Sequence, residues 1–464
     1  MYNLSAKFNE FYKTCVVLPA SVQNDLRQKK NLNIKRLKDG LEEYNSEHGT
    51  NYKISEERVQ GSMAMHTVVQ NDKNDYDIDV AIVFEKEALN GMGAQAARNL
   101  VRDALSYKMG QFNEDPEVKT SCVRIKYAEG YHVDFAVYRR FKTYDWQDNY
   151  EYEHAGSTWT CRDLSSLDEW FKDEIEKHGF ILRKIIRLSK MFCRSRSDWR
   201  MPSGIIQTVL CDEKLDVVSD RLDESFYNTM KAVMNRIAYN TSVPAPVDNG
   251  RELAGRQSDT DRIDNLHSRL EKYLGKLDVL FDEDCAENDA VDAWNQFFNS
   301  DFWSDMLNES VDFSKDCISE RMAYDSGKAR NTEEFIEDKC DVQELYDVSI
   351  ECEVEQNGFR RIPLWKFYNR YTDVFKGYLP HHYDIFCRVK TDAPSYDKIL
   401  WKVRNVGKYA IERDCIRGQI RYTGSTLHEK SCFNGPHYIE CYLIKNNVCI
   451  GIGHIDVKIG GSDD

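Results

Sequence analysis

Two aspartates that flank one apolar residue constrain this chain more than any other feature. From Ile78 to Phe84, apolar side chains recur at every second position, a pattern that predicts a half-buried strand. Asp77 and Asp79 lie two residues apart, so their carboxylates share one face of that strand. Without a counter-ion they would repel each other by up to about 4 kcal/mol at an effective dielectric constant of about 20. The pair therefore indicates a divalent cation, and all-oxygen ligands suit Mg²⁺ or Mn²⁺.

Asp-x-Asp is common by chance, so the pair on its own also fits a solvated start of a strand. Two further motifs favour a functional site. Upstream, Gly61 and Ser62 could turn backbone N–H groups and a hydroxyl toward a phosphate. Downstream, residues 131–138 alternate as a second strand, and Asp134 falls on the face opposite its apolar residues. A third carboxylate could thus join the first two from a neighbouring strand.

Taken in order, Gly61-Ser62, Asp77-x-Asp79 and Asp134 resemble the nucleotidyltransferase fold of the polymerase-beta superfamily. The resemblance is closest to the CD-NTases or SMODS enzymes, the bacterial relatives of cyclic GMP-AMP synthase, and covers roughly residues 1 to 290. It implies two metal ions held by the three aspartates. One ion would activate a hydroxyl and the other would hold a triphosphate, with pyrophosphate leaving in line. Asp134 would lie nearest the attacking hydroxyl and is the implied general base.

A basic stripe at helical spacing follows in residues 181–194, formed by Arg183, Arg187, Lys190 and Arg194. Such a stripe is most often a solvated face. Here Pro202-Ser203-Gly204 comes next, a helix start whose hydroxyl and free N–H groups could receive an anion. In the resembled family, a lysine of this helix and a serine of the following turn hold the triphosphate. The matching positions are Lys190 and Ser203, with Arg187 as a further candidate one turn away.

The last 110 residues or so change character and predict a β-sandwich. Strands are expected over 348–355, 383–391, 400–406, 418–422, 438–445 and 448–458, separated by turn signals. The segments Trp401–Gly407 and Gly435–Tyr442 resemble the adenylyl/guanylyl and SMODS C-terminal sensor domain, AGS-C. This pairing implies bacterial antiphage signalling, with a product that a membrane-associated effector protein reads.

The expected fold class is α+β, with a polymerase-beta-like nucleotidyltransferase core, a helical second lobe and a C-terminal all-β sandwich. We expect the core and its N-terminal helices over 1–165, the helical lobe over 166–300, a linker over 301–341 and the AGS-C-like domain over 342–464. Helices within residues 4–48 should brace the back of the catalytic sheet. One strand is expected over 118–127, before the Asp134 strand.

Composition restricts the partners and the location. The net charge of −15 disfavours duplex nucleic acid as an activator, because a duplex requires a broad basic surface. The absence of a membrane-length apolar run and of a signal peptide predicts a cytoplasmic protein without membrane insertion. The 14 cysteines are then expected as reduced thiols. Cys432, His437 and Cys441 are expected in the core rather than in a zinc site.

The expected activity is template-independent joining of nucleoside or deoxynucleoside triphosphates into a cyclic or linear signal. Some relatives of this architecture, the Hailong type, make DNA oligomers from deoxy-ATP and prime them on a tyrosine of their own C-terminal region. Tyr422, Tyr438 and Tyr442 are the candidates here, although each also fits plain packing in a strand. Two alternatives stay open. One is a degenerate nucleotide sensor, and the other is a toxin-like transferase that modifies a protein or a tRNA.

Overall fold

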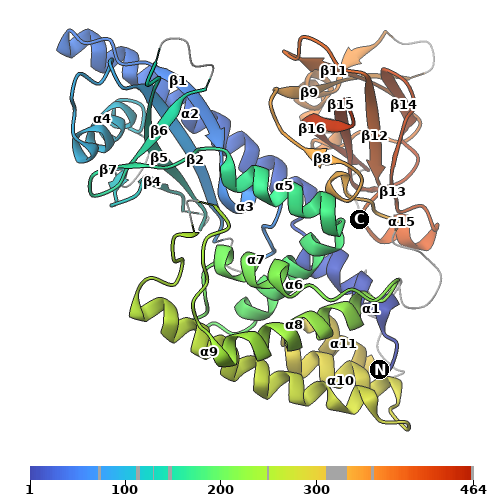
Figure 1. Ribbon diagram of the computed structural model, residues 1–464. Coiled ribbons are helices and arrows are strands. Elements are labelled where there is room, and N and C mark those ends of the chain that lie inside the picture. Colours follow the sequence, from blue (N-terminus) through green and yellow to red (C-terminus); the bar gives the residue numbers. More distant parts are fainter. Residues whose placement is uncertain are drawn as a thin grey trace. The chain divides into compact units, whose positions relative to one another are not determined.

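The computed structural model describes residues 1–71, 75–110, 115–128, 130–144, 149–247, 250–309, 332–356 and 360–460. The chain forms two compact units, Met1–Leu307 and Asn308–Asp464 (Figure 1). The expected α+β class is confirmed, with a mixed sheet and helices in the first unit and two sheets in the second. No helix in the described ranges is long and apolar enough to cross a membrane.

The sheet of the first unit is built around two parallel strands, β2 (Asp77–Glu85) and β5 (His132–Phe141). Strand β1 (Ile54–Val59) pairs antiparallel with β2, and β4 (Val123–Lys126) pairs antiparallel with the first half of β5. The sheet continues through β3 (Glu117–Val118), and through β6 (Glu151–Ala155) and β7 (Trp159–Cys161) beyond the second half of β5. The strand expected over 118–127 is thus a short hairpin, because residues 119–122 turn the chain between β3 and β4.

Two helices, α2 (Ala20–His48) and α4 (Ala94–Ser106), cover one face of this sheet. The alternation read from the sequence explains that layer, since Ile78, Val80, Ile82 and Phe84 are all fully buried beneath the helices. The helices approach each other most closely at Gly40, where a Cβ atom would overlap the backbone carbonyl of Ala104. The aspartates of β2 lie on the opposite face, which the helices leave uncovered.

The second lobe of this unit is helical and is held together by an aromatic core. Its helices are α5 (Ser166–His178), α6 (Ile181–Arg194), α7 (Gly204–Glu213), α8 (Leu222–Tyr239), α9 (Gln257–Leu274), α10 (Glu287–Phe298) and α11 (Asp301–Glu309). Between α9 and α10 the chain forms a 3₁₀ helix, Gly275–Phe281. Trp294, Phe297 and Phe298 of α10 and Trp303 of α11 are at most 1% exposed.

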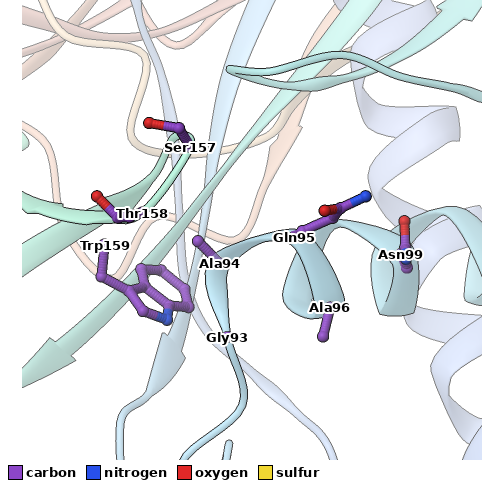
Figure 2. A pocket seen from close by; sticks show the side chains of 8 residues that line it. All are labelled: Gly93, Ala94, Gln95, Ala96, Asn99, Ser157, Thr158 and Trp159. Atoms are coloured by element: carbon purple, nitrogen blue, oxygen red, sulfur yellow. The ribbon is translucent and has the colours of Figure 1, made fainter.

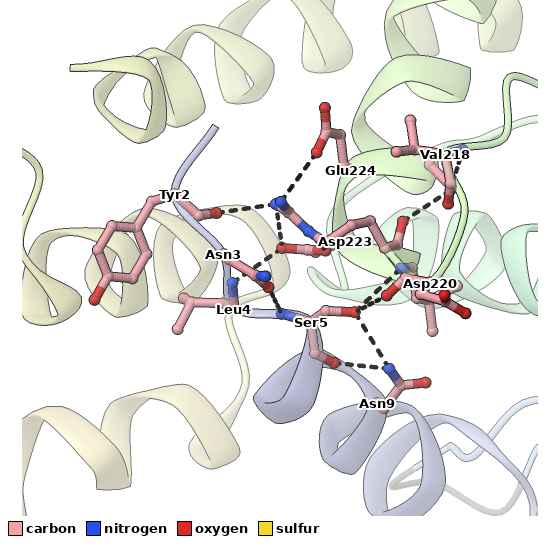
Figure 3. Close-up of polar contacts among 12 residues, drawn as sticks. Tyr2, Asn3, Leu4, Ser5, Asn9, Val218, Asp220, Asp223 and Glu224 are labelled. Carbon is pink, nitrogen blue, oxygen red and sulfur yellow. Dashed lines mark hydrogen bonds and ion pairs between the residues drawn. The ribbon is translucent and has the colours of Figure 1, made fainter. Parts of the chain in front are cut away.

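The first helix, α1 (Ser5–Phe11), belongs to this aromatic core and does not brace the sheet as expected. Phe8 packs against Trp294 at 4.7 Å between ring centroids, and Phe11 against Trp303 at 5.3 Å. Polar contacts fix the segment before α1 (Figure 3): the backbone N–H of Leu4 donates to the fully buried carboxylate of Asp223 at 3.1 Å. Helical periodicity alone could not predict this, since it does not indicate which layer a helix joins.

The second unit consists of two packed sheets, as expected for a sandwich. One contains β9 (Val348–Glu355), β10 (Ile362–Pro363), β11 (Asp384–Thr391) and β14 (Thr426–Lys430). The other contains β8 (Asp341–Val342), β12 (Lys398–Arg404), β13 (Arg417–Arg421), β15 (Gly435–Lys445) and β16 (Val448–Ile459). Short helices α13 (Leu364–Arg370), α14 (Thr372–Phe375) and α15 (Lys408–Glu412) connect strands. Asn446 and Asn447, both with positive φ, form the expected tight turn between β15 and β16.

Charged side chains are buried on the second sheet, under the segment that precedes β8. Lys402 is 2% exposed, and its ammonium lies 2.7 Å from Glu333 and 3.2 Å from Glu440. The hydroxyl of Tyr438 also donates to Glu333, at 2.7 Å. The segment around Glu333 is therefore fixed to the sheet by ion pairing.

Two expectations differ from the structure. Residues 301–309 form α11 with Phe302 and Trp303 buried, and Ile336 is buried in the second unit, so both ends of the expected linker 301–341 are packed. Residues 310–331 lie outside the described residues. Cys352 and Cys387, directly opposite each other on β9 and β11, form a disulfide where reduced thiols were expected. Direct cross-strand neighbours come close enough for that bond, which spacing in the sequence does not disclose.

Candidate active site

The three predicted aspartates converge on the uncovered face of the first sheet. Strands β2 and β5 pair in parallel with Asp79 opposite Asp134 and Asp77 opposite His132. Adjacent strands lie about 4.8 Å apart, so the backbone register alone places Asp79 and Asp134 side by side. Asp134 is 6% exposed, and Asp77 lies at the open end of the strand.

An arginine and a histidine that the sequence did not single out contact the outer two aspartates. Arg124, opposite Asp134 on β4, donates to both of its carboxylate oxygens, at 2.7 and 2.6 Å, and lies 3.3 Å from Asp77. His132 contacts Asp77 through Nε2. This hydrogen bond, followed by the charges of His132, Arg124 and Arg194, lowers the pKa of Asp77 below its usual value. From the sequence, Arg124 could be assigned to the same side of the sheet as Asp134 only if the pairing of β4 with β5 had been known.

Asp79 lies between the other two acids and has no such partner. Its carboxylate forms no ion pair within the described part of the chain. Burial, and then the charges of Asp77 and Asp134, raise the pKa of Asp79 to about 7. A half-buried acid between two others is the kind of group that a divalent cation stabilises, so this donor set fits the predicted metal.

The three carboxylates are not gathered around a single point. The described residues contain one group of metal-ligating side chains whose ligand atoms all lie within 4.8 Å of one another, and it is Glu174, His178 and Asp212, on α5 and α7. The ammonium of Lys177 lies 2.9 Å from Glu174, and His178 lies 3.3 Å from it, so these ion pairs account for the group. For the aspartates, Arg124 donates to both oxygens of Asp134, each of which keeps a further lone pair for another ligand.

Gly61 and Ser62 begin the four-residue helix α3 (Gly61–Ala64), which lies directly against Asp79. Gly61 has φ of 65°, and a Cβ atom there would lie 2.5 Å from Oδ2 of Asp79. The backbone N–H of Gln60 donates to the carbonyl of Asp79 at 2.9 Å. A glycine is required at position 61 for both reasons, the left-handed backbone and the close approach of the carboxylate.

Helix α6 connects this turn to the second lobe through buried cations. Lys190 donates to the side-chain and backbone oxygens of Thr67, at 2.7 and 3.2 Å, just after the Gly-Ser turn. Burial, and then the charges of Arg194 and Arg187, lower the pKa of Lys190 to about 7. The same ammonium lies at the start of α7, where a Cβ on Gly204 would be 3.4 Å from it, and Ser203 is the exposed residue before that helix. Lys190 and Ser203 thus lie close together, as expected.

The structure does not support Arg187 as a triphosphate ligand. Arg187 is 3% exposed and donates to the hydroxyl of Tyr12 at 2.8 Å, in the packing of α6 against the π-helical turn Tyr12–Val16. The reading of the stripe as a solvated face is also wrong, because Arg183 and Lys190 are 3% and 9% exposed. Arg194 is the exposed cation of the stripe, and its charge acts on both Asp77 and Lys190.

The three candidate tyrosines differ in accessibility. Tyr442 is 2% exposed and donates to Glu440 at 2.8 Å, while Tyr438 is half-buried and bonded to Glu333. Burial raises the pKa of both phenols well above the usual value. Tyr422, next to the end of β13, is 67% exposed. Of the three, Tyr422 alone presents an accessible hydroxyl.

A surface hollow of about 550 Å³ lies elsewhere, between the start of α4 and the turn from β6 to β7 (Figure 2). Gly93, Asn99 and Trp159 are among the residues that line it, and no predicted site residue is among them. We assign no role to it.

Comparison with known proteins agrees with this geometry. Residues 56–138 match the nucleotidyltransferase domain of the DncV-like cyclic GMP-AMP synthases, and residues 330–460 match the adenylyl/guanylyl and SMODS C-terminal sensor domain, AGS-C. The chain is a CD-NTase with an AGS-C sensor domain. It is accordingly a nucleotidyltransferase.

Solved structures show the same fold for the CD-NTase part. Vibrio cholerae DncV cyclic AMP-GMP synthase, in complex with the linear intermediate 5′ pppA(3′,5′)pG, aligns with a TM-score of 0.55 at 16% identity over 66% of this chain and 99% of its own. The Vibrio cholerae dinucleotide cyclase DncV with GTP and 5MTHFGLU2 aligns with a TM-score of 0.54 at 17% identity, over 66% of this chain and 98% of its own. At this identity the likeness establishes the fold alone.

Proposed function

We propose that this CD-NTase is a metal-dependent, template-independent enzyme that joins nucleoside or deoxynucleoside triphosphates with release of pyrophosphate. The observation that carries the proposal is the register of β2 and β5, which sets Asp79 beside Asp134 with the Gly61 backbone against Asp79. Asp77, Asp79 and Asp134 are the proposed ligands of two ions, Mg²⁺ or Mn²⁺. Bound there, the ions would make a hydroxyl more nucleophilic and neutralise the triphosphate.

The positions of the other side chains indicate which would bind the triphosphate and which would orient Asp134. Lys190 and Ser203 would hold the triphosphate, since one is a buried cation and the other an exposed hydroxyl at a helix start. Binding a polyanion beside Lys190 favours its charged form and so restores the proton that burial disfavours. Arg124 orients Asp134, the proposed proton acceptor for the attacking hydroxyl.

We further propose that the product is a signal in bacterial antiphage defence, made in the cytoplasm and read by a membrane-associated effector. It would be a linear oligonucleotide, such as oligodeoxyadenylate primed on a tyrosine of the chain, or a cyclic oligonucleotide. For priming, the exposed Tyr422 is the accessible candidate. A phenol hydroxyl can replace a ribose hydroxyl as the attacking group once its proton is removed.

The test is to incubate the purified protein with each NTP and dNTP plus Mg²⁺ and to resolve products and protein by mass. Pyrophosphate with free cyclic species supports the cyclic product. A ladder of linear species, or protein mass rising in nucleotide steps that Tyr422→Phe abolishes, supports the primed linear product. Asp77→Ala with Asp79→Ala should remove all turnover and leave the melting temperature unchanged or higher, since like charges are removed. Full activity of that double variant would refute the proposal.

A further inference from the structure

A cluster of arginines and aromatic rings lies where the loop between α6 and α7 packs on α9. The guanidinium carbon of Arg196 lies 4.7 Å from the ring centroid of Trp199 and 4.2 Å from that of Tyr273. The guanidinium of Arg269 lies 5.2 Å from the Trp199 ring, and the two rings are 5.3 Å apart. Arg200 is exposed on the same loop, and its carbonyl accepts from Asn265 of α9 at 3.3 Å.

The positive charges of this cluster are not cancelled by carboxylates. Some exposed or half-buried arginines elsewhere in the unit are paired with acids, as Arg139 is with Glu153 and Arg236 with Glu213. By contrast, within the described ranges no carboxylate lies within 4.0 Å of the guanidinium nitrogens of Arg194, Arg196, Arg200 or Arg269. An aromatic face fixes a guanidinium through cation–π attraction but leaves its charge available to an anion.

The members of the cluster divide into a support and a contact set. Arg196 donates to the carbonyls of Phe297 and Gln296, at 2.9 and 2.6 Å, and so anchors the loop to the end of α10. The guanidinium groups of Arg194, Arg200 and Arg269 make no hydrogen bond or ion pair within the described residues. These three can turn their N–H groups to a ligand, and a chain of −15 net charge has little reason to gather them without one.

The cluster adjoins the candidate active site. Arg194 is the last residue of α6, one helical turn after Lys190, and its charge acts on both Lys190 and Asp77. The loop then runs through Trp199 to Ser203 at the start of α7. Arg194 thus links the candidate active site to the loop that carries Arg200 and to its contact with α9.

We propose that Arg194, Arg200 and Arg269, supported by Arg196, Trp199 and Tyr273, bind the backbone phosphates of a single-stranded oligonucleotide, the product or growing chain of the active site. This inference rests on the proposed function. A short single strand fits the charge, because three guanidiniums on one loop and one helix match a few phosphates. A duplex needs a wider basic surface than this acidic chain offers.

Binding is tested directly in the inactive Asp79→Asn protein, so that no probe is extended. The probes are fluorescent oligodeoxyadenylate and oligoadenylate of about six nucleotides, a duplex of equal length and an acidic peptide, followed by anisotropy. Arg200→Gln with Arg269→Gln should weaken single-strand binding about tenfold and reduce the salt slope by about 1.4, since each lost phosphate contact removes about 0.7. Arg262→Gln is the matched control: it lies on α9, removes the same charge and is already 3.9 Å from Asp259, so binding should not change.

The outcomes separate this inference from the proposed function. Single-strand binding that depends on Arg200 and Arg269, together with no turnover of any nucleotide by the wild-type protein, would keep the binding surface and reject the enzyme. Turnover with single-strand binding that is absent, or equal in the double variant and the parent, would reject the surface and keep the enzyme. Tighter binding of the duplex or of the acidic peptide than of the single strand would also overturn the proposed binding surface. In the active protein the double variant should release shorter linear products.

Discussion

Replacing Asp79 by asparagine tests the electrostatics of the site, because Asp79 is a half-buried acid placed between two others. The substitution keeps the shape and removes the charge. Its effect on stability should depend on pH in a direction that the pKa of Asp79 fixes. In the folded protein this pKa is raised from 3.8 to about 7.

A carboxyl group with a raised folded-state pKa stabilises the fold below its unfolded pKa, and that contribution is lost as the pH rises through the folded pKa. The free energy of unfolding of the wild-type protein should therefore fall between about pH 4 and pH 7. Asp79→Asn has no carboxyl group at this position and should not lose this contribution. With 1.36 kcal/mol for each pKa unit, the share lost between pH 5.5 and pH 8 is about 2 kcal/mol. For a compact unit of the size of the first one, this loss of free energy corresponds to about 3 °C in melting temperature.

The assay is a thermal melt of both proteins in EDTA at pH 5.5, 6.5, 7.5 and 8. The melting temperature of Asp79→Asn relative to wild type should rise by about 3 °C in total, mostly between pH 5.5 and 7.5, and should level off toward pH 8. Millimolar Mg²⁺ at pH 8 should then raise the wild-type melting temperature and leave that of Asp79→Asn almost unchanged. A difference that is flat or falls with pH would refute the charge arrangement, and equal Mg²⁺ effects on both proteins would refute the metal assignment.

Three other predictions concern single residues. Gly61→Ala should lower turnover at least tenfold with a smaller effect on the melting temperature, because the new Cβ would lie 2.5 Å from Oδ2 of Asp79; normal pyrophosphate release by this variant would contradict the role of the turn. Lys190, whose pKa is lowered to about 7, should take up a proton when a triphosphate binds at pH 8, measured by calorimetry in buffers of different ionisation enthalpy; Lys190→Met should show no such uptake, and equal uptake in both would exclude Lys190. Glu333→Gln should destabilise the second unit by about 3 kcal/mol in a denaturant melt, since it removes one of two acids paired with the buried Lys402. Glu351→Gln, which breaks an exposed pair with Arg388, should cost less than about 1 kcal/mol, and equal costs would count against the buried network.

The sequence was sufficient for features that depend on local periodicity. Alternation predicted the strands that carry Asp77, Asp79 and Asp134, and the paired asparagines predicted the turn at 446–447. These features repeat every two residues or occupy one turn, so a short window of sequence contains them. The parallel register that sets Asp79 beside Asp134 is a long-range property, and no such window discloses it.

The features that could not be predicted from the sequence are also long-range contacts. Arg124 and His132 act on the aspartates only because their strands are adjacent, and the basic stripe of α6 is buried only because a second lobe packs on it. Cationic residues in an amphipathic helix predict exposure by default, so Lys190 and Arg187 looked alike. The structure separates them by their partners, Thr67 for one and Tyr12 for the other.

The packing of α1 in the aromatic core has a consequence for synthesis of the protein. Phe8 and Phe11 have most of their ring partners in residues 294–303, so the first helix emerges from the ribosome long before those partners exist. At 5–20 residues per second the delay is about 15 to 60 s. Throughout that interval an apolar helix of the nascent chain stays uncovered. It is a natural client for a chaperone, and the helical lobe can close only after the first 300 or so residues have been made.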